Sequence, residues 1–355
     1  MSGIVAPLRH ENVALTALRG LAALWVVGHH MSFELGYAGY PFATAFFSPG
    51  DAAVDIFFVL SGFIMTAVHR DLTRDGLGDF FTRRVFRIYP MHLTVLAALV
   101  ALALWGLLVH GAPPADRWSA LPLVAMLVQP IFIHGPTWNV ASWSLSAEMV
   151  CYLVFPLAVV LVRRIEPVGI ALFVLVLGVI EWHTWSPLPW SWPPFERGLE
   201  GFALGMLVQQ AAVQLPRFGF RFASVIEVAA LLGIILVLGF VYHGIKDVPI
   251  FAALLIFGLA SETGLLARAL RFGVFVWLGR ISFSVYLLHG MLLALAFGYL
   301  PPARLPFAHE AQGLVWAGGI TAIILALATV TWLTVEEPAR RFGGRIARRR
   351  SLAAA

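Results

Sequence analysis

Long runs of apolar residues recur along the whole of this 355-residue sequence, and they constrain its fold more than any other feature. The sequence is 60% hydrophobic and 12% charged, and its mean hydropathy is +0.86. Water-soluble domains carry roughly 25% charged residues. A helix of about 20 apolar residues crosses the hydrocarbon layer of a membrane, where backbone polar groups must bond within the segment. The sequence therefore predicts an all-α, polytopic transmembrane helical bundle.

The apolar runs and the residues that interrupt them predict about ten membrane spans. They lie near residues 12–31, 51–69, 87–109, 143–162, 167–183, 198–214, 222–242, 248–261, 274–297 and 312–335. The run 120–133 is too short to cross comfortably and contains two prolines, so we expect a re-entrant or outward-packed segment. The first run contains Arg19 and lacks a clean cleavage site, which favours an uncleaved span over a signal peptide.

The arginines indicate the orientation of these spans. With both termini in the cytoplasm, the inner loops and tails hold 18 of the 23 arginines. The outer loops hold only Arg117, Arg197, Lys246 and Arg304. Positive residues gather on the cytoplasmic side of membrane proteins. We therefore expect one multi-pass domain over residues 1–355 in the inner, or plasma, membrane, with a basic cytoplasmic tail from about residue 339. The net charge of +5 follows from this distribution and does not indicate nucleic-acid binding.

Cysteine and motif content exclude several classes of site. The single cysteine, Cys151, excludes an intrachain disulfide and any Cys-rich metal site. Phosphate-binding Gly-rich loops, nucleophile elbows and metal-ligand clusters are absent from the sequence, so we expect no metal and no permanently bound cofactor.

Arg19 and His30 are ionisable residues within the first span, with ten residues between them. Eleven steps of about 100° return His30 to within roughly 20° of Arg19, about 16 Å further along one helix face. His30 is either a packed core histidine or a base, since a histidine suits removal of a hydroxyl proton at neutral pH. Its neighbour His29 points about 100° away.

The second span carries the segment 55–63, Asp-Ile-Phe-Phe-Val-Leu-Ser-Gly-Phe. A carboxylate inside a span needs a partner, for which Arg19 or a histidine is the obvious kind. Ser61 and Gly62 permit either a close approach of helices or a local break.

Arg84 and Arg87 stand three residues apart before the third span and share a helix face at the cytoplasmic surface. One interpretation is that they anchor the topology or contact anionic lipid headgroups. The other is that the two guanidinium groups clamp a phosphate-bearing cytosolic ligand.

Two later spans add further polar residues. Trp143, Ser144 and Glu148 open the fourth span, and Ser144 and Glu148 face the same way. Glu148 is either in a structural ion pair or engaged in acid–base work or orientation of a histidine. The ninth span contains Arg280, Tyr286 and His289, the last two on one face. In the segment 335–341, Val-Glu-Glu-Pro-Ala-Arg-Arg, we expect the last helix to stop at the inner surface.

In this order these segments resemble the membrane-bound acyltransferase-3 family, over nearly the whole chain. The segments that carry the resemblance are 18–30, 55–63, 84–90, 143–148 and 278–289. The family O-acylates glycans, exopolysaccharides, lipid-linked sugars and some macrolides. Many relatives also carry an extracytoplasmic SGNH esterase-like domain, which this sequence lacks, so we expect it to act alone or with a separate polysaccharide-assembly partner.

The resemblance implies transfer of an acyl group, usually acetyl, from cytoplasmic acyl-CoA as co-substrate to a hydroxyl of an acceptor. We expect the acceptor to be a glycan, a polysaccharide or a lipid-linked sugar, and the alternative is a macrolide-type small molecule. By the family pattern, Arg19 and His30 form the arginine–x10–histidine pair, and Arg84 and Arg87 form the R-x-x-R motif of donor binding. We expect His30 to be the general base, oriented by Glu148 or Asp55. Arg19 and Arg280 would assist donor binding, and Trp143, Ser144, Tyr286 and His289 would line the acceptor side.

Two other classes of function use the same residues differently. A flippase for a lipid-linked saccharide would use the buried ionisable residues as a substrate path, although no internal repeat is visible. A non-catalytic subunit of a polysaccharide-assembly complex would need neither His30 nor the arginine pair. Loss of acyl transfer on substitution of His30 separates both from the enzyme.

Overall fold

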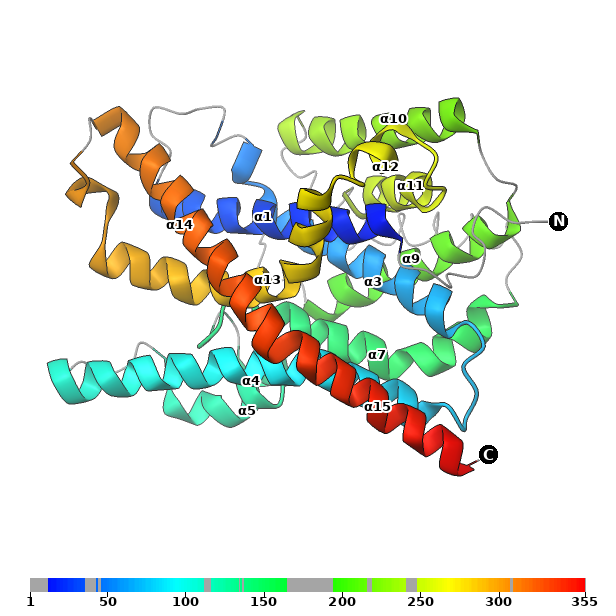
Figure 1. Ribbon diagram of the computed structural model, residues 1–355, viewed down its shortest axis with the longest axis horizontal. Coiled ribbons are helices and arrows are strands. Elements are labelled where there is room, and N and C mark those ends of the chain that lie inside the picture. The colour runs from blue at the N-terminus through cyan, green and yellow to red at the C-terminus, as the bar shows by residue number, and fades with distance from the viewer. Residues whose placement is uncertain are drawn as a thin grey trace. The chain divides into compact units, whose positions relative to one another are not determined.

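Helices are the only regular elements in the part of the chain that the structure describes (Figure 1). The structure is a computed structural model, and it describes residues 12–35, 43, 46–111, 116–133, 135, 137–164, 194–215, 219–240, 248–306 and 309–354. The predicted all-α class is confirmed. The chain forms two compact units, the first from Met1–Val26, Ala45–Leu72 and Leu153–Arg280, the second from Val27–Thr44, Thr73–Tyr152 and Ile281–Ala355.

The described residues form α-helices of very different lengths. They are α1 (Val13–Leu35), α3 (Ala53–His69), α4 (Leu77–His110), α5 (Leu121–Ala125), α6 (Gln129–Phe132), α7 (Ser142–Val162), α9 (Pro194–Gln214), α10 (Phe220–Phe240), α11 (Val248–Ala260), α12 (Leu265–Ala269), α13 (Gly273–Tyr299), α14 (His309–Thr331) and α15 (Glu337–Ala354). Three short 3-10 turns, η1 (Gly50–Ala52), η2 (Trp118–Ala120) and η4 (Pro302–Arg304), and a π-helical turn, η5 (Trp332–Glu336), complete the order.

Seven helices among the described residues are long and apolar enough to cross a membrane. They cover Val13–Phe33, Gly50–His69, Leu77–His110, Ser142–Val162, Phe220–Leu238, Gly273–Tyr299 and Ala311–Arg350, and each coincides with a predicted span. The predicted spans 198–214 and 248–261 are also helical, as α9 and the shorter α11 of 13 residues. The predicted span 167–183 lies outside the described residues. The chain is a multi-pass integral membrane protein.

Local sequence explains the ends of the two helices that carry most of the candidate residues. Asn12 caps α1, because its side-chain oxygen accepts a hydrogen bond from the Leu15 N–H at 3.0 Å. Helix α4 ends at Gly111, which has φ +62°, a left-handed conformation that glycine adopts readily. Helix α1 is unbroken from Val13 to Leu35, so Arg19 and His30 lie on one helix, as predicted.

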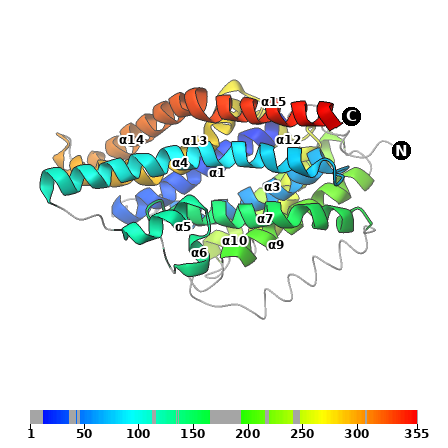
Figure 2. The ribbon, with the colours of Figure 1, turned by 90° about the horizontal axis from the view of Figure 1, so that it is seen from below.

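The run 120–133 does not cross the membrane as one helix. It is divided into η2, α5 and α6, and the turn between the two helices places Leu127 at φ +59°. Helices of five and four residues cannot span the hydrocarbon layer. The segment lies beside α4 (Figure 2), where the buried His92 Nε2 is 2.9 Å from the Val124 carbonyl oxygen.

Close approach of two helix backbones organises the first unit. A Cβ atom added at Gly62 on α3 would overlap the Phe202 carbonyl oxygen of α9, and one added at Gly205 would overlap the Val59 carbonyl oxygen. Small residues allow this separation between membrane helices. Of the two interpretations of the Ser-Gly pair in segment 55–63, the structure therefore supports close packing, since α3 is also unbroken.

The predicted helix stop at the segment 335–341 is wrong. Helix α14 continues through η5 directly into α15, which runs to Ala354. The π-helical turn resets the hydrogen-bond register, so Pro338 falls at the second position of α15, where a missing N–H costs little.

Helix α15 lies along α4 in the second unit, as both views show (Figures 1 and 2). Gly343 faces the side chain of Phe86, and the Arg350 guanidinium donates to the Thr82 hydroxyl at 3.0 Å. The basic tail is therefore a helix fastened to the amino-terminal half of α4.

We predict that Gly205→Ala destabilises the protein by about 1–3 kcal/mol, because the new methyl group forces α3 and α9 apart. Thermal unfolding in detergent micelles measures this. Gly319→Ala on α14 is the matched control, since its Cβ would meet no heavy atom within 4 Å. Equal melting temperatures for Gly205→Ala and the unaltered protein would contradict the prediction.

Candidate functional site

Two histidines from distant helices meet in the second unit. His30 on α1 and His289 on α13 face each other, with 3.3 Å between His30 Nδ1 and His289 Nε2 and 4.8 Å between the ring centroids. His289 is fully buried, and its other nitrogen, Nδ1, lies 2.6 Å from the Tyr286 carbonyl oxygen. His30 is only partly buried. The accessible ring of the pair is therefore His30, and His289 lies behind it.

Two hydroxyl groups continue this cluster. Ser144 Oγ and the Tyr286 hydroxyl are 2.7 Å apart, and Ser144 Oγ also donates to the Ala141 carbonyl oxygen at 3.0 Å. Because a serine hydroxyl has one proton, its bond to a carbonyl leaves Tyr286 as the donor to Ser144. Each of the two hydroxyl protons thus forms a hydrogen bond within the protein. Such hydroxyls are suited to positioning other groups, whereas an activated nucleophile gives its proton to a base.

His29 belongs to the edge of the same cluster. Its ring meets His30 edge-on, with centroids 5.2 Å apart, and meets Phe33 at 4.7 Å. The side chain is 8% exposed. The two adjacent histidines therefore take different contacts: His30 Nδ1 lies 3.3 Å from His289 Nε2, whereas the His29 ring packs edge-on against His30 and Phe33.

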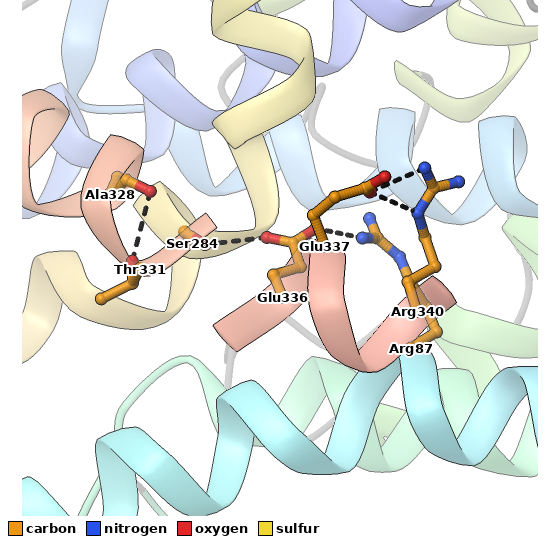
Figure 3. A network of polar contacts seen from close by, with 7 residues as sticks. All are labelled: Arg87, Ser284, Ala328, Thr331, Glu336, Glu337 and Arg340. Atoms are coloured by element: carbon orange, nitrogen blue, oxygen red, sulfur yellow. Dashed lines mark hydrogen bonds and ion pairs between the residues drawn. The ribbon is translucent and has the colours of Figure 1, made fainter. Parts of the chain in front are cut away.

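Arg87 is held by a carboxylate that sequence reasoning missed. It forms an ion pair with Glu336, the last residue of η5, while Ser284 on α13 donates to the second oxygen of Glu336 at 2.8 Å (Figure 3). The Arg87 guanidinium also lies 4.8 Å from the centre of the Phe283 ring. The side chains of Arg87 and Glu336 are 20% and 2% exposed. A buried charge requires such a partner.

Arg84 lies on an aromatic surface one turn earlier on α4. Its guanidinium is 5.6 Å from the centre of the Tyr152 ring and 5.9 Å from that of Phe80. The Tyr152 hydroxyl in turn donates to Glu148. Glu148 and Tyr152 both interact electrostatically with Arg87. Arg84 and Arg87, proposed as a pair from the sequence, and Glu148, proposed apart from them, therefore belong to one cluster.

The same two helices carry the histidine cluster and the arginine cluster. On α7, Ser144 belongs to the first and Glu148, one turn away, to the second. On α13, His289 and Ser284 divide in the same way, five residues apart. At 1.5 Å per residue these separations are about 6 and 8 Å along the helix axes. Trp143, half-buried, lies beside Ser144 at the start of α7.

The remaining candidates belong to the first unit. Asp55 is 2% exposed and receives two bonds from Arg197 on α9, at 2.6 and 2.8 Å. Arg197 was expected in an outer loop, and the expected kind of partner was Arg19 or a histidine. The structure instead places Arg197 in a helix and beside Asp55. Arg19 is half-buried on α1, and Arg280 is exposed on α13.

Three residues that define these contacts were not found from sequence: Glu336, Tyr152 and Arg197. A buried arginine at position 87 does require a carboxylate, and two stand at 336 and 337. Reading those residues as a helix stop concealed the partner. Arg197 and Asp55 are 142 positions apart, so no local pattern joins them.

The profile of the acyltransferase-3 family, described as "Acyltransferase domain", matches residues 12–335. Among similar proteins, Acyltransferase MdmB of Streptomyces mycarofaciens is 34% identical over 94% of this chain and 92% of its own length. Exopolysaccharide production protein ExoZ of Rhizobium meliloti is 28% identical over 84% of this chain and 92% of its length. Peptidoglycan O-acetyltransferase OatA of Listeria monocytogenes is 23% identical over 93% of this chain but only 56% of its own length. No solved structure matches the chain.

We predict that Glu336→Gln destabilises the protein by about 3 kcal/mol, because it leaves the Arg87 charge without its buried partner. The double variant Arg87→Met with Glu336→Met should recover most of this loss. Thermal unfolding of the three proteins in detergent gives the comparison.

The matched control is Glu337→Gln. Glu337 is the next residue and binds Arg340 and Arg341, whose side chains are 58% and 73% exposed. Pairs with exposed partners contribute at most about 1 kcal/mol. A loss in Glu337→Gln as large as that in Glu336→Gln would refute the special role of the buried pair.

Proposed function

This chain belongs to the acyltransferase-3 family, and on that premise we propose that it moves an acetyl group from cytoplasmic acetyl-CoA to a saccharide hydroxyl, with His30 as general base. The protein is an acyltransferase embedded in the membrane by several spans. The observation that carries the proposal is the pairing of a partly exposed His30 with a buried His289, in the same unit as Arg84 and Arg87.

His30 has the chemistry that the transfer requires. Its imidazole takes the proton of the acceptor hydroxyl, and the oxygen attacks the carbonyl carbon of the thioester. The carbon–sulfur bond then breaks, and the departing thiolate receives the proton from the imidazolium. The hydroxyls of Ser144 and Tyr286 are bonded to each other and to a backbone carbonyl, which favours direct transfer over an acyl-enzyme.

Arg84 and Arg87 are suited to bind the phosphates of the donor. A guanidinium has five N–H groups, and the pair with Glu336 engages Nη1 of Arg87. The ion pair fixes the position of Arg87, and Tyr152 supports Arg84 from one face. The assignment of Arg19 and Arg280 to donor binding stays a prediction from the sequence, and we propose that Glu148 acts on the arginine cluster through Tyr152.

The acceptor is proposed to be a sugar of a polysaccharide or of a lipid-linked saccharide. The support comes from two relatives whose names refer to exopolysaccharide production and to peptidoglycan O-acetylation. Asp55, bound by Arg197, is proposed to hold α3 and α9 in register rather than to take part in proton transfer.

We predict that His30→Ala lowers the rate of acetyl transfer about 10²- to 10⁴-fold, the usual contribution of a general base. The assay uses the purified chain in nanodiscs with radiolabelled acetyl-CoA and a panel of glycans. His29→Ala should retain transfer, because the His29 ring packs edge-on against Phe33, whereas the proposed base is His30, whose Nδ1 lies 3.3 Å from His289. Undiminished transfer by His30→Ala would sink the assignment.

We predict that Arg84→Gln weakens CoA binding about 10-fold or more, since a charge-assisted hydrogen bond to phosphate contributes about 1.5–3 kcal/mol. Isothermal titration of CoA into the reconstituted protein measures the dissociation constant. Arg83→Gln is the matched control, because this neighbouring arginine is exposed and lies against Gly344 of α15. Equal CoA affinities of the two variants would refute donor binding by Arg84 and would favour its interpretation as a topology anchor.

A further inference from the structure

We propose that His289 is a positioning residue that fixes the tautomer of His30, so that the basic lone pair lies on Nε2. This inference rests on the proposed function, because it concerns how the base is prepared. It starts from a line of three groups: the Tyr286 carbonyl, the buried His289 ring and the partly buried His30 ring.

The direction of each hydrogen bond in this line can be assigned in turn, starting from the Tyr286 carbonyl. A backbone carbonyl oxygen can only accept, so His289 Nδ1, 2.6 Å away, carries a proton and donates it. A neutral imidazole has one N–H, which leaves His289 Nε2 as an acceptor. His30 Nδ1, 3.3 Å from that nitrogen, must then carry the proton. The only remaining nitrogen of His30 is Nε2, and there the lone pair resides.

Burial keeps His289 in the neutral form that this argument requires. Its side chain is fully buried in the second unit, and a charge without a counterion is costly in such surroundings. Among the described residues, the groups placed against it include the Tyr286 carbonyl and ring, the Val285 backbone and the His30 ring, and none of these is an anion. The carboxylate of Glu148 is instead bonded to Tyr152.

The arrangement also holds after His30 has taken the acceptor proton. The imidazolium has N–H groups on both nitrogens, and Nδ1–H still donates to His289 Nε2. His289 therefore occupies the place behind the base where sequence analysis expected Glu148 or Asp55. Its contribution is orientation, with a neutral acceptor that neither gains nor loses a proton during the reaction.

Nitrogen-15 NMR of the full chain in nanodiscs, with labelled histidine, tests the tautomer directly. The His30 resonances are identified by their loss in His30→Gln. We expect a protonated Nδ1 and an unprotonated Nε2 for His30 at neutral to mildly basic pH, where the ring is uncharged. A His30 ring protonated on Nε2 instead would overturn the inference, whatever the activity of the enzyme.

Two substitutions of His289 test the consequence. His289→Leu removes the acceptor, and we expect kcat to fall about 10- to 100-fold with little change in CoA affinity, because the donor phosphates lie at the arginine cluster. His289→Gln keeps an oxygen near the former Nε2 position, and we expect it to restore most of kcat. Unchanged kcat in His289→Leu, or equal losses in both variants, would refute the positioning role.

His92→Leu is the matched control for burial. His92 is also fully buried in the second unit and bonded to a backbone carbonyl, that of Val124, but it does not touch His30. We expect the His92→Leu variant to unfold at a lower temperature than the unaltered protein, with an unchanged kcat per folded molecule. The outcomes separate the two proposals. Full activity of His30→Ala would refute the role of His30 as base. Full activity of His289→Leu together with an inactive His30→Ala would refute only the positioning role of His289.

Discussion

The cost of placing a charge in a low-dielectric interior explains the main contacts of this protein. Each unit holds a buried carboxylate with an arginine partner from another helix: Asp55 with Arg197 in the first, Glu336 with Arg87 in the second. Removing one partner of such a pair leaves a charge that the surroundings cannot solvate. The pairs therefore fix which helices must lie together, more specifically than apolar contacts do, because a lipid-like surface packs against any apolar helix equally well.

The π-helical turn is a consequence of the same requirement. In an uninterrupted α-helix from His309 to Ala354, each side chain would be rotated by about 100° from the one before it. The five π-helical residues shift that rotation at Glu336, so that its carboxylate faces Arg87 and Ser284, while the next residue, Glu337, binds the exposed arginines of α15. Such turns often occur at functional sites. Here the turn provides Glu336, the ion-pair partner of Arg87, which is one of the two arginines proposed to bind the donor.

How much the sequence could predict depends on whether a feature is local. The apolar runs correctly predicted the seven long apolar helices of the described residues, and α1 contains both Arg19 and His30 as predicted. Grouping of Arg84 with Glu148, or of His30 with His289, requires knowing which helices are neighbours, and periodicity along one helix contains no such information. The partner role of Glu336 was missed for a further reason. Pro338 was taken to end the helix, but a proline indicates a helix end only when the hydrogen bonds before it are α-helical, and here a π-helical turn precedes it.

A neutral histidine behind the base has a physical advantage over a carboxylate in this environment. A carboxylate would orient the ring as well, but it would add a charge to a fully buried position and would need a cation of its own. The Tyr286 carbonyl supplies the required polarity through a backbone group that α13 already holds in place. Among the described residues, the groups at the two His289 nitrogens are thus backbone groups and the His30 ring, without a carboxylate. The histidine cluster lies one helical turn from an arginine cluster in which Arg87 is paired with Glu336 and Arg84 lies on the Tyr152 ring. In the proposed mechanism, the anionic donor would bind at the arginine cluster, and the proton would be transferred at the His30 ring, one helical turn away.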